Sequence, residues 1–133
     1  MIKLFIGSKG SGKTKTLIEL TNSAAESSKG SVVCIEKGDK LRHEITYKAR
    51  LIDTIEYDIN DAEALYGFIA GILASNSDIT DIFVDSSLKI CGNDVAAVEK
   101  LIPKLEAICA NVNLVMSASI AVEECPASIK AFA

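Results

Sequence analysis

The sequence predicts an α/β fold, a three-layer sandwich in which helices cover both faces of a mostly parallel β-sheet. Short apolar segments alternate with longer amphipathic ones, which is the order of right-handed β-α-β units. Aromatic residues make up 5% of the chain and Trp is absent, so the apolar residues are mainly aliphatic, as in strands buried on both faces. A length of 133 residues with 49% apolar content fits one domain, residues 1–133, with its own core.

Four short segments have the character of core strands, because each is an apolar run bounded by Gly, Ser, Asn or an acidic residue. They are residues 2–6, 32–36, 81–85 and 113–119. Residues 49–53 (ARLID) also look extended, whereas the charged stretch 37–50 has little periodicity. For this part of the chain we expect a hairpin or an irregular excursion.

Two helices are expected between the first three strands. One begins near Lys13 and has its apolar residues on one side: Leu17, Ile18, Leu20, Ala24 and Ala25. The second covers residues 61–75, with Asn60 or Asp61 as its N-cap. Its apolar side chains lie nearly all round, which predicts a well-buried helix. The spacing of Gly67 and Gly71 suggests that it packs closely against a neighbour.

Two further helices follow the third strand. Residues 93–110 form an amphipathic pattern that Pro103 should kink or split, because proline cannot donate the helical hydrogen bond. Residues 126–133 are long enough for a short terminal helix only. Because ligands of parallel sheets bind at the carboxyl ends of the strands, the loops between strands and helices are where function is expected.

Charge and cysteine content exclude several classes of site. The net charge of −4 and the isoelectric point near 5.0 disfavour nucleic acid and anionic membranes as partners. The four cysteines are isolated and His43 is the only histidine, which argues against a zinc site. We interpret the cysteines as small core residues in a reducing compartment, and expect a cytoplasmic protein with no signal peptide and no membrane span.

Residues 7–14 (GSKGSGKT) match the phosphate-loop pattern G-x-x-x-x-G-K-[ST], and they lie between a predicted strand and a predicted helix. Backbone N–H groups of such a loop converge on one anion, and the helix N-terminus adds positive potential. The predicted nucleotide-binding residues are Gly7, Ser8, Lys9, Gly10, Ser11, Gly12, Lys13, Thr14 and Lys15. Lys13 is expected to reach the β- and γ-phosphates, and the Thr14 hydroxyl to ligate Mg²⁺. Lys9 and Lys15 are expected to give general electrostatic support.

Asp85, at the end of the apolar segment IFVD, is the candidate for the second magnesium ligand. The sequence offers few of the side chains that accelerate hydrolysis in ATPases, which are a glutamate or glutamine that orients water and an arginine. Ser86 stands where many ATPases have a glutamate, and the sequence contains no glutamine that could orient water. The only arginines are Arg42 and Arg50, both in the irregular stretch.

These motifs, together with the segments VVCIEKGDKL and DIFVDSSLKI, resemble the RecA-like core of the P-loop NTPases. The resemblance covers residues 2–90 and implies that Glu36, or else Asp39, polarises the attacking water, with Arg42 nearby. It also implies that the strand at 113–119 lies between the first and third strands and carries a polar sensor, Ser117 or Ser119. A weaker similarity to cytosolic thymidine kinases covers the same span.

The sequence departs from both families. The DNA-gripping loops of recombinases and the cysteine-rich lid of thymidine kinases are missing, so neither strand exchange nor thymidine phosphorylation is expected. The chain is similar to small bacterial ATP-binding proteins, a group for which no activity is implied.

The leading interpretation is a magnesium-dependent nucleotide-binding protein with Lys13, Asp85 and Glu36 as catalytic candidates. ATP is favoured over GTP because the guanine-reading element N-K-x-D is absent. Hydrolysis would be slow or would require a partner, and a homo-oligomer or a protein partner is left open. Two alternatives remain: a phosphotransferase whose acceptor pocket is built by residues 37–58, and a non-catalytic interaction module.

Overall fold

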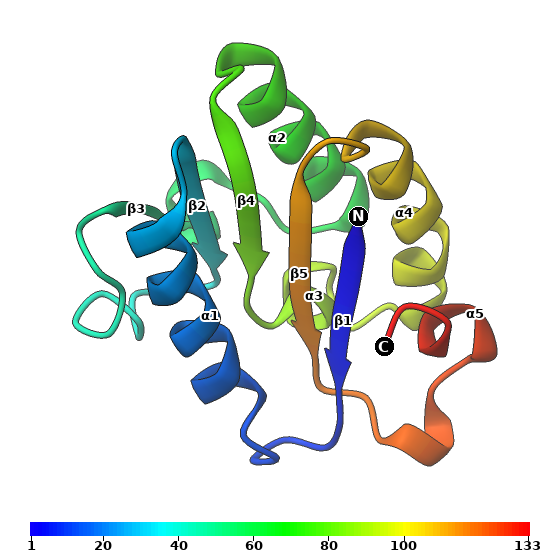
Figure 1. Ribbon diagram of the computed structural model, residues 1–133. Helices are drawn as coiled ribbons and strands as arrows, with labels where there is room; N and C mark the ends of the chain where they lie inside the picture. The colour runs from blue at the N-terminus through cyan, green and yellow to red at the C-terminus, as the bar shows by residue number, and fades with distance from the viewer.

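The computed structural model describes all residues from Met1 to Ala133. Its centre is a five-stranded sheet with the order β1-β5-β4-β2-β3, in which every neighbouring pair is parallel (Figure 1). The strands are β1 (Ile2–Ile6), β2 (Ser31–Glu36), β3 (Ala49–Asp53), β4 (Ile79–Val84) and β5 (Asn113–Ala118). The predicted α/β class and the parallel sheet are therefore confirmed.

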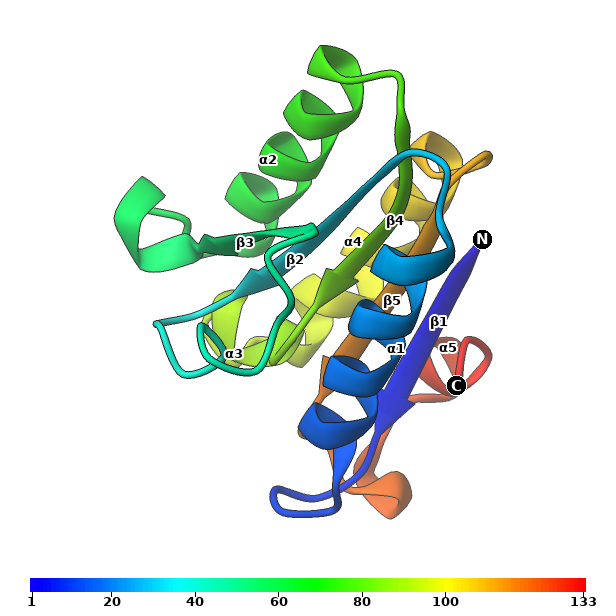
Figure 2. The ribbon, with the colours of Figure 1, turned by 60° about the vertical axis from the view of Figure 1, so that its left-hand side comes forward.

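Helices lie on both faces of this sheet. The α-helices are α1 (Lys13–Ser27), α2 (Ala62–Ser75), α3 (Ser87–Ile90), α4 (Val95–Ile108) and α5 (Ala127–Lys130), and short 3₁₀ segments cover Thr54–Tyr57 and Val122–Glu124. Figure 2 shows α1 in front of the sheet, with α2 and α4 behind it. The arrangement is compatible with a three-layer sandwich.

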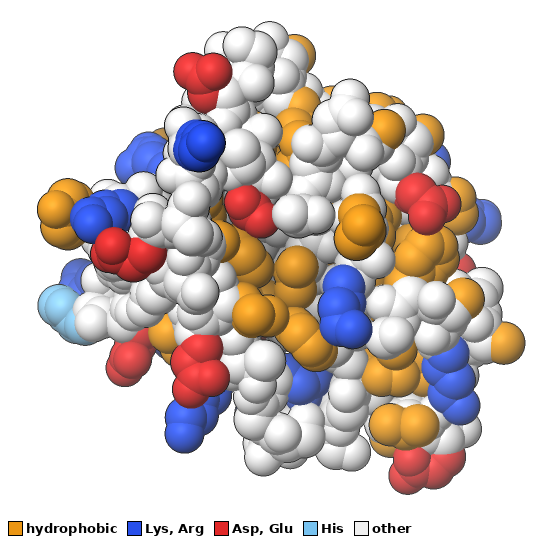
Figure 3. Space-filling view, in the orientation of Figure 1, with side chains coloured by type: hydrophobic (Ala, Val, Ile, Leu, Met, Phe, Trp, Pro, Cys, Tyr) orange, Lys and Arg blue, Asp and Glu red, His pale blue; other side chains and the backbone are white.

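The two faces have cores of very different size. On the face of α2 and α4, 25 buried residues form one apolar cluster, which includes Ile69 and Leu105. On the face of α1, seven buried residues form the other, centred on Leu17 and Phe83. Because α1 is the only helix on that face, apolar side chains show at the surface between α1 and β1 (Figure 3).

The stretch between β2 and β3 forms an irregular excursion and not a hairpin, so the second of the two expectations is confirmed. Ala49–Asp53 is extended as predicted, but it pairs in parallel with β2, with Val32 opposite Ala49 and Glu36 opposite Asp53. A loop therefore carries the chain back along the sheet. Leu41 and Ile45 anchor this loop in the smaller core, which explains how a charged and poorly periodic segment is ordered.

The prediction that α2 is well buried was wrong. Of the two N-cap candidates, Asn60 and Asp61, the structure has Asp61, which accepts a hydrogen bond from the Ala64 N–H at 2.8 Å. However, only Leu65 and Ile69 are buried, and Gly67 and Gly71 are exposed. A Cβ atom built at either glycine meets no atom within 4 Å, so their spacing does not reflect close packing.

Smaller differences concern α1 and α4. Leu20 was placed on the buried side of α1, but it is 39% exposed, and Thr21 is buried instead. The helix α4 is not split at Pro103, which lies on its exposed side. There the carbonyl that loses its helical donor can be solvated, so the helix continues.

All four cysteines are buried and none is in a disulfide, which agrees with their interpretation as core residues. Burial raises the pKa of the Cys34 thiol to about 12 and that of Cys91 to about 11, so both stay protonated at neutral pH. The structure contains no cluster of three or more His, Cys, Asp or Glu side chains suited to a metal ion. None of its helices is both long enough and apolar enough to cross a bilayer.

Candidate functional site

The loop between β1 and α1 has a conformation that depends on glycine. Gly10 and Gly12 have φ angles of 85° and 89°, in the left-handed region that residues with a Cβ rarely adopt. Gly12 is the N-cap of α1, and no side chain caps the helix or puts an acidic group in its first turn. The positive end of α1 is therefore left for an external group.

The backbone amides of this loop are largely unpaired. Of the N–H groups from Lys9 to Lys15, only that of Ser11 donates to a protein acceptor, the Ser8 carbonyl at 3.2 Å. The N–H group of Gly7, at the start of the loop, is by contrast paired: it donates to the Ile120 carbonyl at 3.0 Å. Consecutive unpaired N–H groups at a helix N-terminus form an anion-binding site.

Lys13 closes this loop with its own side chain. Its Nζ donates to the Ser8 carbonyl at 2.9 Å and to the Ser11 hydroxyl at 3.2 Å. An ammonium group has three N–H donors, so one remains for an oxygen of a bound anion. The lysine is thus fixed at the loop by two bonds while part of its donor capacity stays free.

Asp85 follows β4 and lies at the centre of a polar network. Its Oδ1 accepts hydrogen bonds from the Thr14 hydroxyl at 3.1 Å and the Ser117 hydroxyl at 2.9 Å, and its Oδ2 accepts one from Ser86 at 3.3 Å. The Ser86 N–H also donates to the Ser117 hydroxyl at 2.8 Å. The network joins the ends of β4 and β5 to the first turn of α1, and its central carboxylate is only 8% exposed.

Ser86 has a backbone conformation that costs energy. Its φ of 57° and ψ of 49° are left-handed, which costs a non-glycine residue about 1 kcal/mol. The turn aims both its N–H and its hydroxyl at the Asp85–Ser117 pair. Strain of this kind persists where the surroundings fix the geometry, which agrees with a functional position.

Thr14 and Asp85 are the residues that could supply oxygen ligands to a magnesium ion in this cavity. Mg²⁺ prefers oxygen ligands at about 2.1 Å in an octahedron, so two adjacent ligands lie about 3 Å apart. The Thr14 Oγ1 and the Asp85 Oδ1 are 3.1 Å apart. Two protein oxygens are too few to hold Mg²⁺ alone, but this ion is commonly bound by one or two protein groups together with phosphate oxygens and water.

Glu36 is buried at the end of β2, with 2% exposure, and it is not a solvent-facing carboxylate. Burial raises its pKa, with smaller contributions in the same direction from Asp53 and Asp85, while the backbone N–H groups of Leu41 and Lys40 oppose the shift. Its two carboxylate oxygens accept hydrogen bonds from the Leu41 N–H at 3.3 and 3.1 Å. Glu36 therefore holds the loop after β2 in place.

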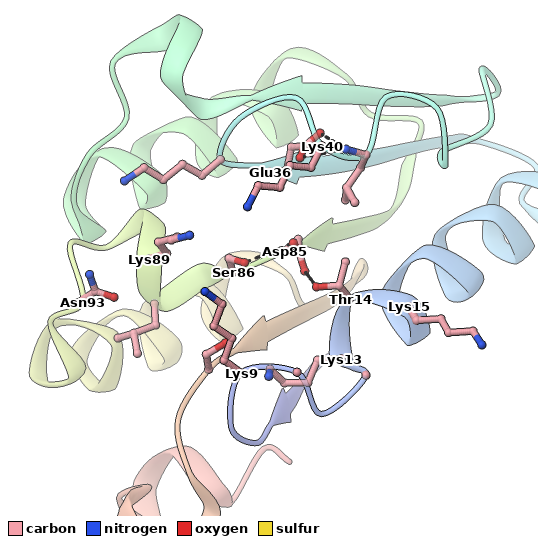
Figure 4. A pocket seen from close by; sticks show the side chains of 16 residues that line it. Lys9, Lys13, Thr14, Lys15, Glu36, Lys40, Asp85, Ser86, Lys89 and Asn93 are labelled. Carbon is pink, nitrogen blue, oxygen red and sulfur yellow. Dashed lines mark hydrogen bonds between the residues drawn. The ribbon is translucent and has the colours of Figure 1, made fainter.

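These groups line one cavity of about 560 Å³ at the carboxyl ends of the strands. It is strongly cationic, although the protein as a whole is acidic, because six lysines and only two carboxylates line it. Figure 4 shows Lys9 and Lys89 pointing into the same space, whereas Lys15 points away from it. The lining lysines are Lys9, Lys13, Lys15, Lys37, Lys40 and Lys89, the carboxylates are Glu36 and Asp85, and the apolar residues are Leu41 and Leu88.

Not all predicted residues meet in this cavity. Asp39 is exposed and forms an ion pair with Arg42 at 3.7 Å, and neither lines the cavity. Arg50 also lies outside it, on the edge strand β3. Of the two polar sensor candidates, Ser117 donates a hydrogen bond to the Asp85 carboxylate, and Ser119 lines the same cavity as Asp85.

The sequence analysis did not single out four of the polar lining residues: Lys37, Lys40, Lys89 and Asn93. They follow β2 and β4, which are separated in the sequence and adjacent in the sheet. Lysines placed shortly after two strands were the available signal, but the order of the strands is needed to bring them together.

Comparison of the sequence with protein-family models gives no match, and a search of curated proteins gives none either. The geometry of the cavity is therefore the basis for inferring a function.

Proposed function

We propose that this protein binds a magnesium–nucleoside triphosphate, with ATP favoured, in a P-loop NTPase fold with a RecA-like core. The observation that carries the proposal is the row of unpaired backbone N–H groups between Lys9 and Lys15, at the uncapped N-terminus of α1. They would hold the phosphates together with the free N–H of Lys13. Lys9 would add positive charge from the loop.

Thr14 and Asp85 would hold the magnesium ion, directly or through a bound water. When bound, Mg²⁺ supplies positive charge that neutralises the phosphate oxygens. Ser117 and Ser86 keep the Asp85 carboxylate in position through the hydrogen bonds described above. Thr14 would exchange its hydrogen bond to Asp85 for a metal contact.

Hydrolysis would be slow in the isolated chain. Glu36 is the candidate for the base that activates water. Both of its carboxylate oxygens, however, already accept the Leu41 N–H. No arginine lines the cavity, so no guanidinium can stabilise the charge that develops during phosphoryl transfer. A protein partner or a second copy of the chain that supplies an arginine would accelerate the reaction.

Phosphoryl transfer to a small molecule is the second candidate. It is favoured by the size and polarity of the cavity, which extends from the phosphate loop to Lys37 and Lys40, within the stretch 37–58. Phosphate release in buffer alone indicates hydrolysis, and release of nucleoside diphosphate that depends on an added acceptor indicates transfer. A non-catalytic module would do neither.

Thermal unfolding with and without nucleotide tests the proposal. At a hundredfold excess over the dissociation constant, Mg-ATP should add about 2.7 kcal/mol, which is about 10 °C in Tm for a domain of this size. Lys13→Ala should lose most of this shift, whereas Lys29→Ala, at the opposite end of the sheet, should keep it. If neither Mg-ATP nor Mg-GTP shifts the Tm of the wild type, the protein is not a nucleotide-binding protein.

A further inference from the structure

The cavity contains more positive charge than the phosphate loop contributes. Lys37 and Lys40 follow β2, and Lys89 lies in α3, so these three line the cavity from outside the loop. We call them the opposite-wall lysines. The structure has two ion pairs, Arg42 with Asp39 and Lys48 with Glu26, and neither includes an opposite-wall lysine.

Glu36 and Asp85 offset only part of this charge, because two carboxylates share the cavity with six lysines. Both carboxylates are buried and already accept hydrogen bonds from neighbouring groups. Unpaired lysines that share a cavity repel one another, so the arrangement costs stability unless an anion occupies it.

We propose that the opposite-wall lysines form a second anion subsite, which binds a small ligand carrying a phosphate group next to the bound nucleotide. This inference rests on the proposed function, because the loop itself would be filled by the nucleotide phosphates. Lys9 of the loop and Lys89 point toward the same space, so the two subsites are contiguous (Figure 4).

The chemistry of the lining favours phosphate over carboxylate. A phosphate group carries up to two negative charges whereas a carboxylate carries one, so three lysines in one cavity favour phosphate by charge. Lysine binds phosphate as a point charge. Because Leu41 and Leu88 are the only apolar lining residues and no aromatic ring is present, the second ligand is a polar phosphorylated molecule and not a nucleobase.

Calorimetric titration of the protein saturated with magnesium and a non-hydrolysable ATP analogue tests the subsite. One titrant is inorganic phosphate and the other is glycerol 3-phosphate, so the two arms separate free phosphate from a phosphomonoester. The variant carries Lys37→Gln, Lys40→Gln and Lys89→Gln. The control carries Lys29→Gln, Lys100→Gln and Lys130→Gln, which change the net charge equally outside the cavity.

The wild type and the control should bind at least one titrant with one-to-one stoichiometry. The opposite-wall variant should lose at least tenfold in that affinity while its affinity for the nucleotide changes less than threefold. Its Tm without ligand should equal or exceed that of the wild type, because like charges are removed, and this also verifies folding.

Three results would overturn the subsite. The first is that the saturated wild type binds neither titrant, and the second is equal binding by variant and control. The third is an equal loss of nucleotide affinity in the opposite-wall variant, which would assign these lysines to the nucleotide itself. If the wild type binds no nucleotide, the proposed function fails separately, and the titration is repeated on the free protein with the same two variants.

Discussion

Asp85 is the residue through which most of the site is connected. Its carboxylate joins α1, β4 and β5 by accepting from Thr14, Ser86 and Ser117. The geometry of the Thr14–Asp85 pair leads to a prediction about metal dependence.

Magnesium should increase the affinity of the wild type for ATP, and Thr14→Ala should remove most of that increase. Thr14→Ser should keep it, because serine retains the hydroxyl that would contact the ion. A titration of fluorescent ATP analogue with Mg²⁺ and again with a chelator in excess measures the difference. Equal magnesium dependence in Thr14→Ala and Thr14→Ser would contradict the assignment.

Glu36 leads to a prediction about pH. Its pKa is raised in the folded protein above the ordinary value of 4.5, so the folded state binds the proton more tightly than the unfolded state. Its contribution to stability is therefore full below pH 4.5 and falls as the pH rises toward the folded pKa. Glu36→Gln removes this fall but keeps an oxygen that can accept the Leu41 N–H.

The free energy of unfolding of Glu36→Gln minus that of the wild type should therefore increase from pH 4.5 upward. Urea denaturation across this range measures it, and the other carboxylates cancel in the difference. Glu36→Ala should be less stable than Glu36→Gln by about 1–3 kcal/mol at every pH, because the Leu41 N–H loses its acceptor. A difference between Glu36→Gln and the wild type that does not change with pH would refute the role of burial.

At the scale of the elements, the sequence predicted the features that depend on neighbouring residues in the chain, such as the positions of strands and the start of a helix. The apolar runs identified β1, β2, β4 and β5, and the capping residue Asp61 marked the start of α2. Two features were missed because they depend on neighbours distant in sequence. The parallel pairing of β3 depends on how the loop after β2 packs, and the exposure of α2 could not be read from a helix with apolar residues nearly all round.

The exposed glycines of α2 give a prediction about stability. Gly67→Ala and Gly71→Ala should each stabilise the protein by about 0.5–1 kcal/mol, because alanine loses less backbone entropy and the added Cβ meets no atom within 4 Å. Gly30→Ala is the matched control. There a Cβ would lie 2.1 Å from the Asp78 carbonyl, so the same change should destabilise the protein. Chemical denaturation measures all three variants.

At the scale of the whole molecule, the loop residues of the site could be predicted and the full cavity could not. Gly7 to Thr14 form a contiguous motif whose chemistry is local. The lysines that follow β2 and β4 meet only because these strands are neighbours in the sheet. The sequence therefore indicated a phosphate site on an acidic protein but not how far the positive potential extends beyond the loop.

Because all four cysteines are free and buried, the rate at which they react with an external thiol reagent measures how often the structure opens. In the native state, an aromatic disulfide reagent should react at least about 10³-fold more slowly than in denaturant, because reaction needs an opening that costs about 5 kcal/mol or more. Absorbance of the released thiolate measures the rate, and saturating Mg-ATP should slow it further. Rapid modification of any of the four cysteines in the folded protein would contradict this burial.

The pairing of β1 with β5 has a consequence for synthesis on the ribosome. Residues 2–6 emerge well before residues 113–118, the strand with which they pair, and the Gly7 N–H needs the carbonyl of Ile120. A nascent chain thus contains residues 7–14 long before β5 is available to pair with β1 and fix the conformation of this loop. Fragments that stop short of β5 would contain the motif and yet lack the strand against which it is built, so under the proposed function they should not bind a triphosphate.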